Sequence, residues 1–168
     1  MKSDLIYREG SIDDKESLKQ LGILSYNQFS KILAPADWNT MDRFLNNDKM
    51  WDQLVNNSKI FVCEDNGKII GMAYLVPGGN PTHIYPADWS YIRMVGVNSE
   101  YRGKGIAKRL TQMCVDYARQ SKEKTVGLHT SELMDAARHV YESLGFTIHK
   151  EIDPIYGMKY WLYKLELS

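Results

Sequence analysis

Hydrophobic positions in the first third of the chain change from an extended run to helical spacing. The run LIYREG (residues 5–10) predicts a strand. A helical segment follows, which the sequence APAD should end at Pro35. Asp37 is a candidate N-cap for a second helical region, which can divide at its polar centre NNDK. The apolar positions of these two segments are Leu18, Leu21, Phe29 and Ile32, then Met41, Phe44, Leu45, Trp51, Leu54 and Val55.

Two strand-like runs in the middle of the chain are joined by a turn sequence. KIFVCE (59–64) and KIIGMAYLV (68–76) are rich in residues that favour strands. Asn66 and Gly67 between them both tolerate positive φ, so we expect a hairpin. The next segment, PGGNPTHIYPAD (77–88), carries three prolines and two glycines and is predicted to be a loop.

The second half of the chain alternates between strand and helix patterns. A helix is expected over 106–120 and another over 133–144, the latter with Leu133 facing inward. Gly145 suits the left-handed residue that ends a helix, and Phe146 can pack back onto the last turn. The predicted strands are WSYIRMVGV (89–97), KTVGLHT (124–130), FTIHKEI (146–152) and YWLYKLEL (160–167).

The predicted order of elements is β-α-α-β-β-β-α-β-α-β-β. The β-α-β units indicate an α/β (α+β) fold with a mixed sheet and helices on its faces. The length of 168 residues suits a single domain, 1–168, with a hydrophobic core.

Composition disfavours several classes of function. The 21 Lys and Arg balance the 21 Asp and Glu, without the basic excess that is typical of nucleic-acid binding. No apolar run approaches the ~20 residues of a membrane span, and MKSDLIYREG turns polar too early for a signal peptide. We therefore expect a cytoplasmic protein. Cys63 and Cys114 fall in apolar patterns and are expected to be buried, and no CxxC or Cys/His cluster predicts a metal site.

The stretch VGVNSEYRGKGIAKRL (95–110) places glycines and cations where a strand gives way to a helix. Unpaired N–H groups at a helix N-terminus attract phosphate oxygens, and glycine lets the backbone approach them closely. Neither a Walker loop nor a complete Rossmann fingerprint is present, because Lys108 stands where the latter needs Gly or Ala. The remaining candidate is a pyrophosphate loop, R-x-x-G-x-A, from Arg102 to Ala107, with Lys108 and Arg109 adding positive charge.

Two spaced motifs resemble signatures of the GNAT superfamily of N-acetyltransferases. Residues 95–110 are similar to its acetyl-CoA signature, an apolar strand ending in Val followed by [QR]-x-x-G-x-[GA]. DAARHVYESLGF (135–146) is similar to the next signature, a helix ending in Tyr-x-x-x-Gly-Phe. IYREGSIDD (6–14) resembles the usual opening strand and helix start, so the resemblance covers nearly the whole chain.

This resemblance implies a mostly antiparallel seven-stranded sheet whose fourth and fifth strands splay apart, with acetyl-CoA in the gap as co-substrate. It implies transfer of the acetyl group to a primary amine of a small molecule or peptide by direct attack on the thioester. The coenzyme-binding residues would be Val95, Gly96 and Val97 for the pantetheine arm and Arg102, Gly103, Lys104, Gly105, Ile106 and Ala107 for the pyrophosphate.

The implied reaction needs a neutral amine, a donor to the carbonyl oxygen and a proton for the departing thiolate. The backbone N–H near Val97 is the candidate donor. Tyr141 is the candidate acid by its position in the second signature, with a plain core aromatic as the alternative. Asp88, Glu132 and His129 are candidate bases, and each also suits a structural role. A base acting through water, or none, stays open.

The chain departs from the family pattern at Met134. Many members have Asn there, seven residues before the tyrosine, in contact with the pantetheine arm. We expect Ser131 or Thr130 to supply that contact if it is kept.

The resemblance places an acceptor pocket among the first two helices, the loop before the fourth strand and the chain near its end. The aromatic and histidine side chains available there are Tyr26, Phe29, Trp38, Trp51, His83, Tyr85, Trp89, Tyr91 and Tyr156. They suit an apolar or cationic acceptor, or simply a core. Arg93 alternates with Tyr91 and Trp89, so it can either hold a substrate carboxylate or lie on the surface.

Two other functions stay open at this point. Met134 and the lack of a glutamate in 89–97 are compatible with a degenerate domain that binds or senses acyl-CoA without turnover. A fold of this shape without coenzyme A is the other. The closing strands, 146–151 and 159–167, can also pair across a homodimer.

Overall fold

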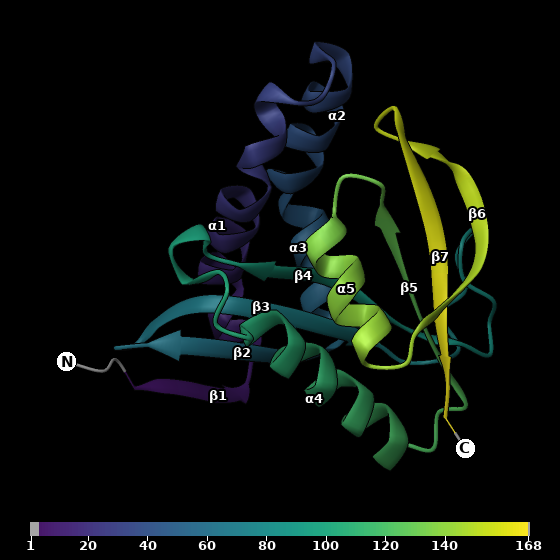
Figure 1. The fold of residues 1–168 in the computed structure, drawn as a ribbon. Coiled ribbons are helices and arrows are strands. Elements are labelled where there is room, and N and C mark those ends of the chain that lie inside the picture. The colour runs from purple at the N-terminus through teal and green to yellow at the C-terminus, as the bar shows by residue number, and fades with distance from the viewer. Residues whose placement is uncertain (1–3, 168) are drawn as a thin grey trace.

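The computed structural model describes residues 4–167, and seven strands within them form one sheet (Figure 1). The strand order is β1-β2-β3-β4-β5-β7-β6, and every neighbouring pair is antiparallel except β4 with β5. The strands are β1 (Leu5–Glu9), β2 (Lys59–Asp65), β3 (Lys68–Val76), β4 (Ser90–Val97), β5 (Thr125–Ser131), β6 (Thr147–Ile155) and β7 (Met158–Glu166). The expected mixed, mostly antiparallel seven-stranded sheet is confirmed.

Helices cover both faces of this sheet, as expected (Figure 1). The first three pack on one face with a core cluster that contains Trp51, and the last two pack on the other with a cluster that contains Leu110. The helices are α1 (Lys15–Tyr26), α2 (Pro35–Leu45), α3 (Asp48–Asn57), α4 (Ile106–Gln120) and α5 (Asp135–Ser143).

The start of α2 differs from the sequence-based expectation. The first helical segment ends before Pro35, so the predicted break is confirmed, but Pro35 is the first residue of α2 after the N-cap Ala34, so the predicted N-cap Asp37 is wrong. A proline fits this position because the first helical N–H has no partner within the helix. The division at NNDK is confirmed, because Asn47 caps α3 and its side-chain oxygen accepts from the N–H groups of Lys49 and Met50.

Two apolar side chains that were expected to face inward are exposed. A short 3-10 helix over Asn27–Lys31 follows α1 and changes the periodicity, which leaves Ile32 57% exposed. Helix α5 begins at Asp135, so Leu133 lies before it and is 47% exposed. Phe29 stays buried.

The turn predictions are confirmed. Asn66 and Gly67 both have positive φ, 51° and 80°, in the turn between β2 and β3. Gly145 has a φ of 99°, and the N–H of Phe146 donates to the carbonyl of Tyr141 at 3.1 Å. Both cysteines are buried and free.

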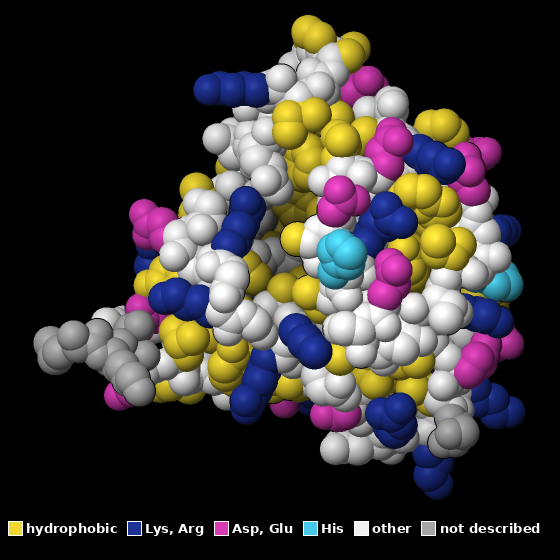
Figure 2. All heavy atoms as spheres, in the orientation of Figure 1, with side chains coloured by type: hydrophobic (Ala, Val, Ile, Leu, Met, Phe, Trp, Pro, Cys, Tyr) yellow, Lys and Arg dark blue, Asp and Glu magenta, His cyan; other side chains and the backbone are white. Residues whose placement is uncertain are grey.

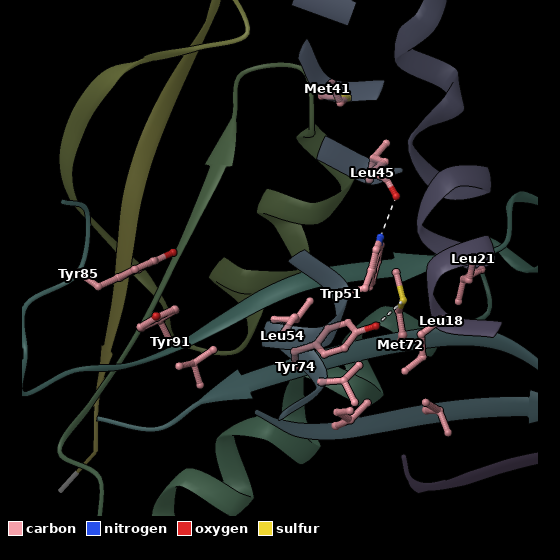
Figure 3. Packing of buried hydrophobic residues seen from close by; sticks show 14 of the residues in the cluster. Leu18, Leu21, Met41, Leu45, Trp51, Leu54, Met72, Tyr74, Tyr85 and Tyr91 are labelled. Atoms are coloured by element: carbon pink, nitrogen blue, oxygen red, sulfur yellow. Dashed lines mark hydrogen bonds between the residues drawn. The ribbon is translucent and has the colours of Figure 1, made fainter. Parts of the chain in front are cut away.

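The core on the α1–α3 face includes hydrogen bonds as well as apolar contacts (Figure 3). The indole N–H of Trp51 donates to the carbonyl of Leu45 at 2.8 Å, which ties α3 to the end of α2. A Cβ on Gly22 of α1 would lie 2.6 Å from the Trp51 ring, so glycine is what permits this contact. Among the described residues, no helix has both the length and the apolarity needed to cross a membrane.

Candidate functional site

The parallel strands β4 and β5 pair only at one end. Their ladder contains Ser90 with Val126 and Tyr91 with Gly127, after which the two strands diverge. The carboxyl-terminal halves of both strands therefore border a gap in the sheet (Figure 1).

The backbone of Val97 faces this gap. The N–H of Asn98 donates to the carbonyl of Ile70 at 2.8 Å, so these two residues form a hydrogen-bonded pair between β4 and β3. In an antiparallel ladder such pairs alternate with non-hydrogen-bonded ones, so Val97, opposite Gly71, directs its N–H and C=O away from β3. These groups form an open edge toward the gap.

A β-bulge in β4 interrupts the alternation of the strand and places two neighbouring side chains on the same face of the sheet. Met72 pairs with Gly96 and Tyr74 with Arg93, so Ala73 faces two residues, Met94 and Val95. Met94 has a φ of 54°, a conformation that non-glycine residues rarely adopt. As a result, Arg93 and Met94 both lie on the α1–α3 face, whereas Val95 packs on the α4 face.

The loop before α4 presents free backbone donors. Gly103 and Gly105 have φ values of 79° and 77°, and a Cβ on either would meet nothing within 4 Å. The first helical bond runs from the N–H of Arg109 to the carbonyl of Gly105 at 3.0 Å. Within residues 4–167, the N–H groups of residues 103–108 have no hydrogen-bond acceptor. This geometry favours an anion at the N-terminus of α4.

A cleft of about 430 Å³ joins these features (Figure 2). Figure 2 shows a hollow with hydrophobic side chains inside it and Lys and Arg side chains near its rim. The predicted coenzyme-binding residues that line it are Val95, Gly96, Val97, Arg102, Gly103, Gly105, Ile106, Ala107 and Tyr141. Lys104 and Ser131 do not line it.

Tyr141 reaches this cleft from α5. Its side chain is 7% exposed, and its ring packs edge-on against Phe146 with 6.1 Å between the ring centroids. Burial raises the pKa of its hydroxyl, which keeps the phenol protonated. Among the described residues, the hydroxyl has no hydrogen-bond partner, so it is free to donate into the cleft.

The residues discussed for the pantetheine contact lie close to one another. Met134 lines the cleft, and the hydroxyl of Thr130 contacts its sulfur at 3.5 Å. The hydroxyl of Ser131 is fully buried without a partner among the described residues. Neither hydroxyl is presented to the cleft in this arrangement.

Two of the three candidate bases lie outside both pockets. Asp88 is exposed in the loop before β4, at the opposite end of that strand from Val97. Glu132 is exposed and bridges to β7, because its carboxylate accepts from the N–H of Lys159 at 3.2 Å. Its own N–H donates to the carbonyl of Lys159 at 2.9 Å. These contacts give Glu132 a structural role.

His129 is the one of the three that faces a pocket. A second pocket of about 320 Å³ shares Tyr26 with the cleft, and His129 of β5 lies in its wall. Burial, with the charges of Arg93 and His83, lowers the pKa of His129 to about 4, so the imidazole is neutral at pH 7.

The predicted acceptor residues separate into three places. Tyr26, His83, Tyr85, Tyr91, Arg93 and Tyr156 line the second pocket. Phe29 lines the cleft, Trp51 is in the core, and Trp38 is partly buried against the same core. Trp89 precedes β4 and packs against His149, with 5.3 Å between ring centroids, so it does not share the pocket with Arg93.

Sequence reasoning missed the contribution of α1 and the turn after it. Ser25, Gln28 and Ile32 line the cleft, and the side-chain oxygen of Gln28 accepts from Arg102 at 3.2 Å. One available signal was Gly96, because a glycine within an apolar strand indicates a close approach. A Cβ there would lie 3.0 Å from Oγ of Ser25. The cleft also contains Lys108, Leu133, Met134, Asp135, Ala136, Ala137 and Val140.

A family comparison accounts for this geometry. The model of the acetyltransferase (GNAT) family matches residues 25–146. The chain belongs to the acetyltransferase (GNAT) family. The matched span includes β4, the glycine loop, α4, β5 and α5, which are the elements that build the cleft. The resemblance of the two sequence motifs is thus confirmed.

Individual GNAT relatives match over shorter stretches. N-alpha-acetyltransferase 30 of Schizosaccharomyces pombe is 34% identical over 92 residues, which are 55% of this chain and 59% of that protein. N-acetyltransferase 8B of Mus musculus is 31% identical over 94 residues, 55% of this chain and 39% of that one. The chain therefore matches about two fifths to three fifths of the length of these curated relatives.

A solved structure supports the GNAT fold over the whole described chain. The PaiA N-acetyltransferase from Thermoplasma acidophilum, in complex with coenzyme A, superimposes with a TM-score of 0.78 at 15% sequence identity. The match covers 98% of this chain and 99% of that one. At this level of identity the similarity establishes the fold.

Proposed function

We propose that this protein is an acetyl-CoA-dependent N-acetyltransferase that transfers an acetyl group to a primary amine of a small molecule or peptide. One observation carries the proposal: the open backbone edge at Val97 lines the same cleft as Gly103 and residues 105–108, whose N–H groups have no acceptor within residues 4–167. An extended chain with amide groups could pair with the edge at Val97, and a diphosphate at its end could accept from the N–H groups of the loop before α4.

The described residues fit coenzyme A by their donor chemistry. The N–H groups of Gly103 to Lys108, which have no acceptor in the described part of the chain, would hold the pyrophosphate, with Arg102 beside it. The edge of β4 at Val95 to Val97 would hydrogen-bond the pantetheine amides. Acetyl-CoA supplies the activated acetyl group.

Tyr141 would act as the general acid. In the overall step, a nitrogen–carbon bond forms to the acetyl group and the carbon–sulfur bond breaks. The sulfur takes the phenolic proton of Tyr141, and the tyrosine regains a proton from the amine through solvent. The raised pKa of Tyr141 keeps the donor protonated before the step. The N–H of Val97 would donate to the carbonyl oxygen as negative charge develops on it.

The amine would enter in its neutral form. No carboxylate lines the second pocket, and His129, with a pKa of about 4, is a weak base for an ammonium group. This arrangement supports deprotonation by solvent before binding in preference to a dedicated base. Asp88 and Glu132 have no part in this mechanism, because neither lines the cleft or the second pocket.

Two measurements test the proposal. Calorimetric titration with acetyl-CoA should give one site, and a panel of primary amines should release free coenzyme A thiol above the hydrolysis rate. Acetyl-CoA binding without thiol release from any amine would instead support a binding or sensing domain. The absence of both binding heat and thermal stabilisation by acetyl-CoA would reject coenzyme A altogether.

A further inference from the structure

Arg93 carries a charge that no acidic residue within residues 4–167 pairs with at close range. Its guanidinium is partly buried on the α1–α3 face, where its Cζ lies 5.9 Å from the ring centroid of Phe44. Among the described residues, no Asp or Glu oxygen lies within 4.0 Å of it and no hydrogen bond engages it. A partly buried arginine without a partner forgoes the bidentate interaction that its geometry favours.

The pocket in front of Arg93 is free of acidic groups. None of the fifteen residues that line it is Asp or Glu, and its only permanently charged side chain is Arg93. His129 is neutral at pH 7. A polyamine or another multiply cationic acceptor would find no counter-ion there and would be repelled by Arg93. An acceptor with an anionic group would find its partner.

The remaining walls include several aromatic rings. Tyr85 and Tyr91 stack with 4.0 Å between ring centroids (Figure 3 shows both), and Tyr26 and Tyr156 add two further rings. Tyr156 and Gly157 form the β6–β7 turn with positive φ values of 54° and 72°. This turn lies against α2, since a Cβ on Gly157 would be 2.7 Å from Asp37 Oδ2. A volume of about 320 Å³ is at the small end for ligand pockets.

The orientation of an acceptor follows from Tyr26 and the β4 bulge. Tyr26 lines both the cleft and the second pocket, so the two spaces meet at its ring. Arg93 lies in the second pocket, and Val95, two residues farther along β4, lies in the cleft. An anionic group held at Arg93 leaves the other end of the acceptor directed toward the cleft.

We propose that the acceptor is a small primary amine that also carries a carboxylate, of the amino-acid type, and that Arg93 binds this carboxylate beside the tyrosine walls. This inference rests on the proposed function and specifies its substrate class. The unpaired arginine also disfavours the protonated amine electrostatically, which helps to present the neutral nucleophile.

Matched acceptors and matched variants test the inference. L-phenylalanine, L-phenylalaninamide and phenethylamine share one apolar body, and only the first carries a carboxylate. The wild-type kcat/KM should favour L-phenylalanine over both by about tenfold or more at equal concentrations of neutral amine. Arg93→Met should abolish this preference without changing acetyl-CoA affinity. Arg43→Met, an exposed arginine on α2, is the control and should behave as wild type.

Several outcomes would overturn the inference. The first is an equal wild-type kcat/KM for the three acceptors, and the second is an equal loss of kcat/KM for all three in Arg93→Met. The third is a wild-type preference for O-phosphoethanolamine over β-alanine, which would indicate a phosphate site. The wild-type comparison stands alone if Arg93→Met does not fold. Failure of the proposed function looks different, because then no acceptor of any charge releases thiol although acetyl-CoA binds.

Discussion

The hydroxyl oxygen of Tyr85 lies 2.6 Å from Nδ1 of His129, in the wall of the second pocket. Burial raises the pKa of Tyr85, so its hydroxyl stays protonated and donates to a neutral imidazole. The pair is thus an uncharged hydrogen bond between the loop before β4 and strand β5. Protonation of His129 would remove the acceptor at Nδ1.

This pairing predicts a loss of stability in mild acid. Below pH 6.5 the unfolded chain takes up a proton at His129, whereas the folded chain does so only near pH 4. The unfolded state binds more protons in this window, so the free energy of unfolding should fall by ~3 kcal/mol between pH 6.5 and 4 because of this residue. Urea unfolding at several pH values measures the effect.

The control for this experiment is a comparison of two histidine variants. In His129→Gln the free energy of unfolding should no longer fall between pH 6.5 and 4. His139→Gln, which removes an exposed histidine on α5, should show the same fall as the wild type. An unchanged slope in His129→Gln would show that another group governs acid stability.

Gly105→Ala should weaken coenzyme binding by disturbing the backbone at the start of α4. The φ of 77° would cost alanine about 1–2 kcal/mol, although its Cβ has open space. Gly67→Ala is a matched control, with a φ of 80° and equally open space in the β2–β3 turn. Both variants should lose similar thermal stability, but only Gly105→Ala should bind acetyl-CoA more weakly by calorimetry. Equal affinities in the two variants would contradict the assignment of the loop.

Tyr141→Phe should slow turnover by about a hundredfold and leave acetyl-CoA affinity nearly unchanged. The phenyl ring keeps the contact with Phe146, and the lost hydroxyl has no partner among residues 4–167. Steady-state kcat and a binding titration together measure this. Wild-type kcat in the variant would assign Tyr141 to packing alone.

The midpoint of the pH profile of kcat/KM should follow the pKa of the acceptor amine. If solvent deprotonates the amine, the rate rises with pH up to the pKa of the free amine. Acceptors of lower pKa should then shift the whole profile to lower pH by the same amount. A profile whose midpoint is the same for all acceptors would instead identify a titrating group of the protein as the base.

Local patterns in the sequence were sufficient for much of the fold. Asn66 and Gly67 specify their turn because few residues accept both dihedrals, and the apolar stripe over 106–120 predicted α4 with its observed bounds. The N-cap was misplaced at Asp37 because Pro35, which separates the two helical segments, is also the first residue of α2.

Parts of the site depend on contacts between distant segments, and the sequence could not show them. The glycine loop was predictable because the strand, the glycines and the helix are contiguous. The bulge at Met94 was not, and it decides that Arg93 and Val95 lie in different pockets. Likewise, Glu132 is adjacent in sequence to the site but bonds to Lys159 of β7.

The brief ladder between β4 and β5 divides the sheet into two antiparallel units, β1 to β4 and β5 with β7 and β6. Within each unit every strand is hydrogen-bonded to the next, and the chain passes from the first unit to the second through α4. Each of the two buried core clusters contains side chains from both units, so packing across the seam, besides the two backbone pairs, sets the width of the cleft. A substitution in the shared core beside the seam should therefore alter the cleft even when it lies outside the cleft wall.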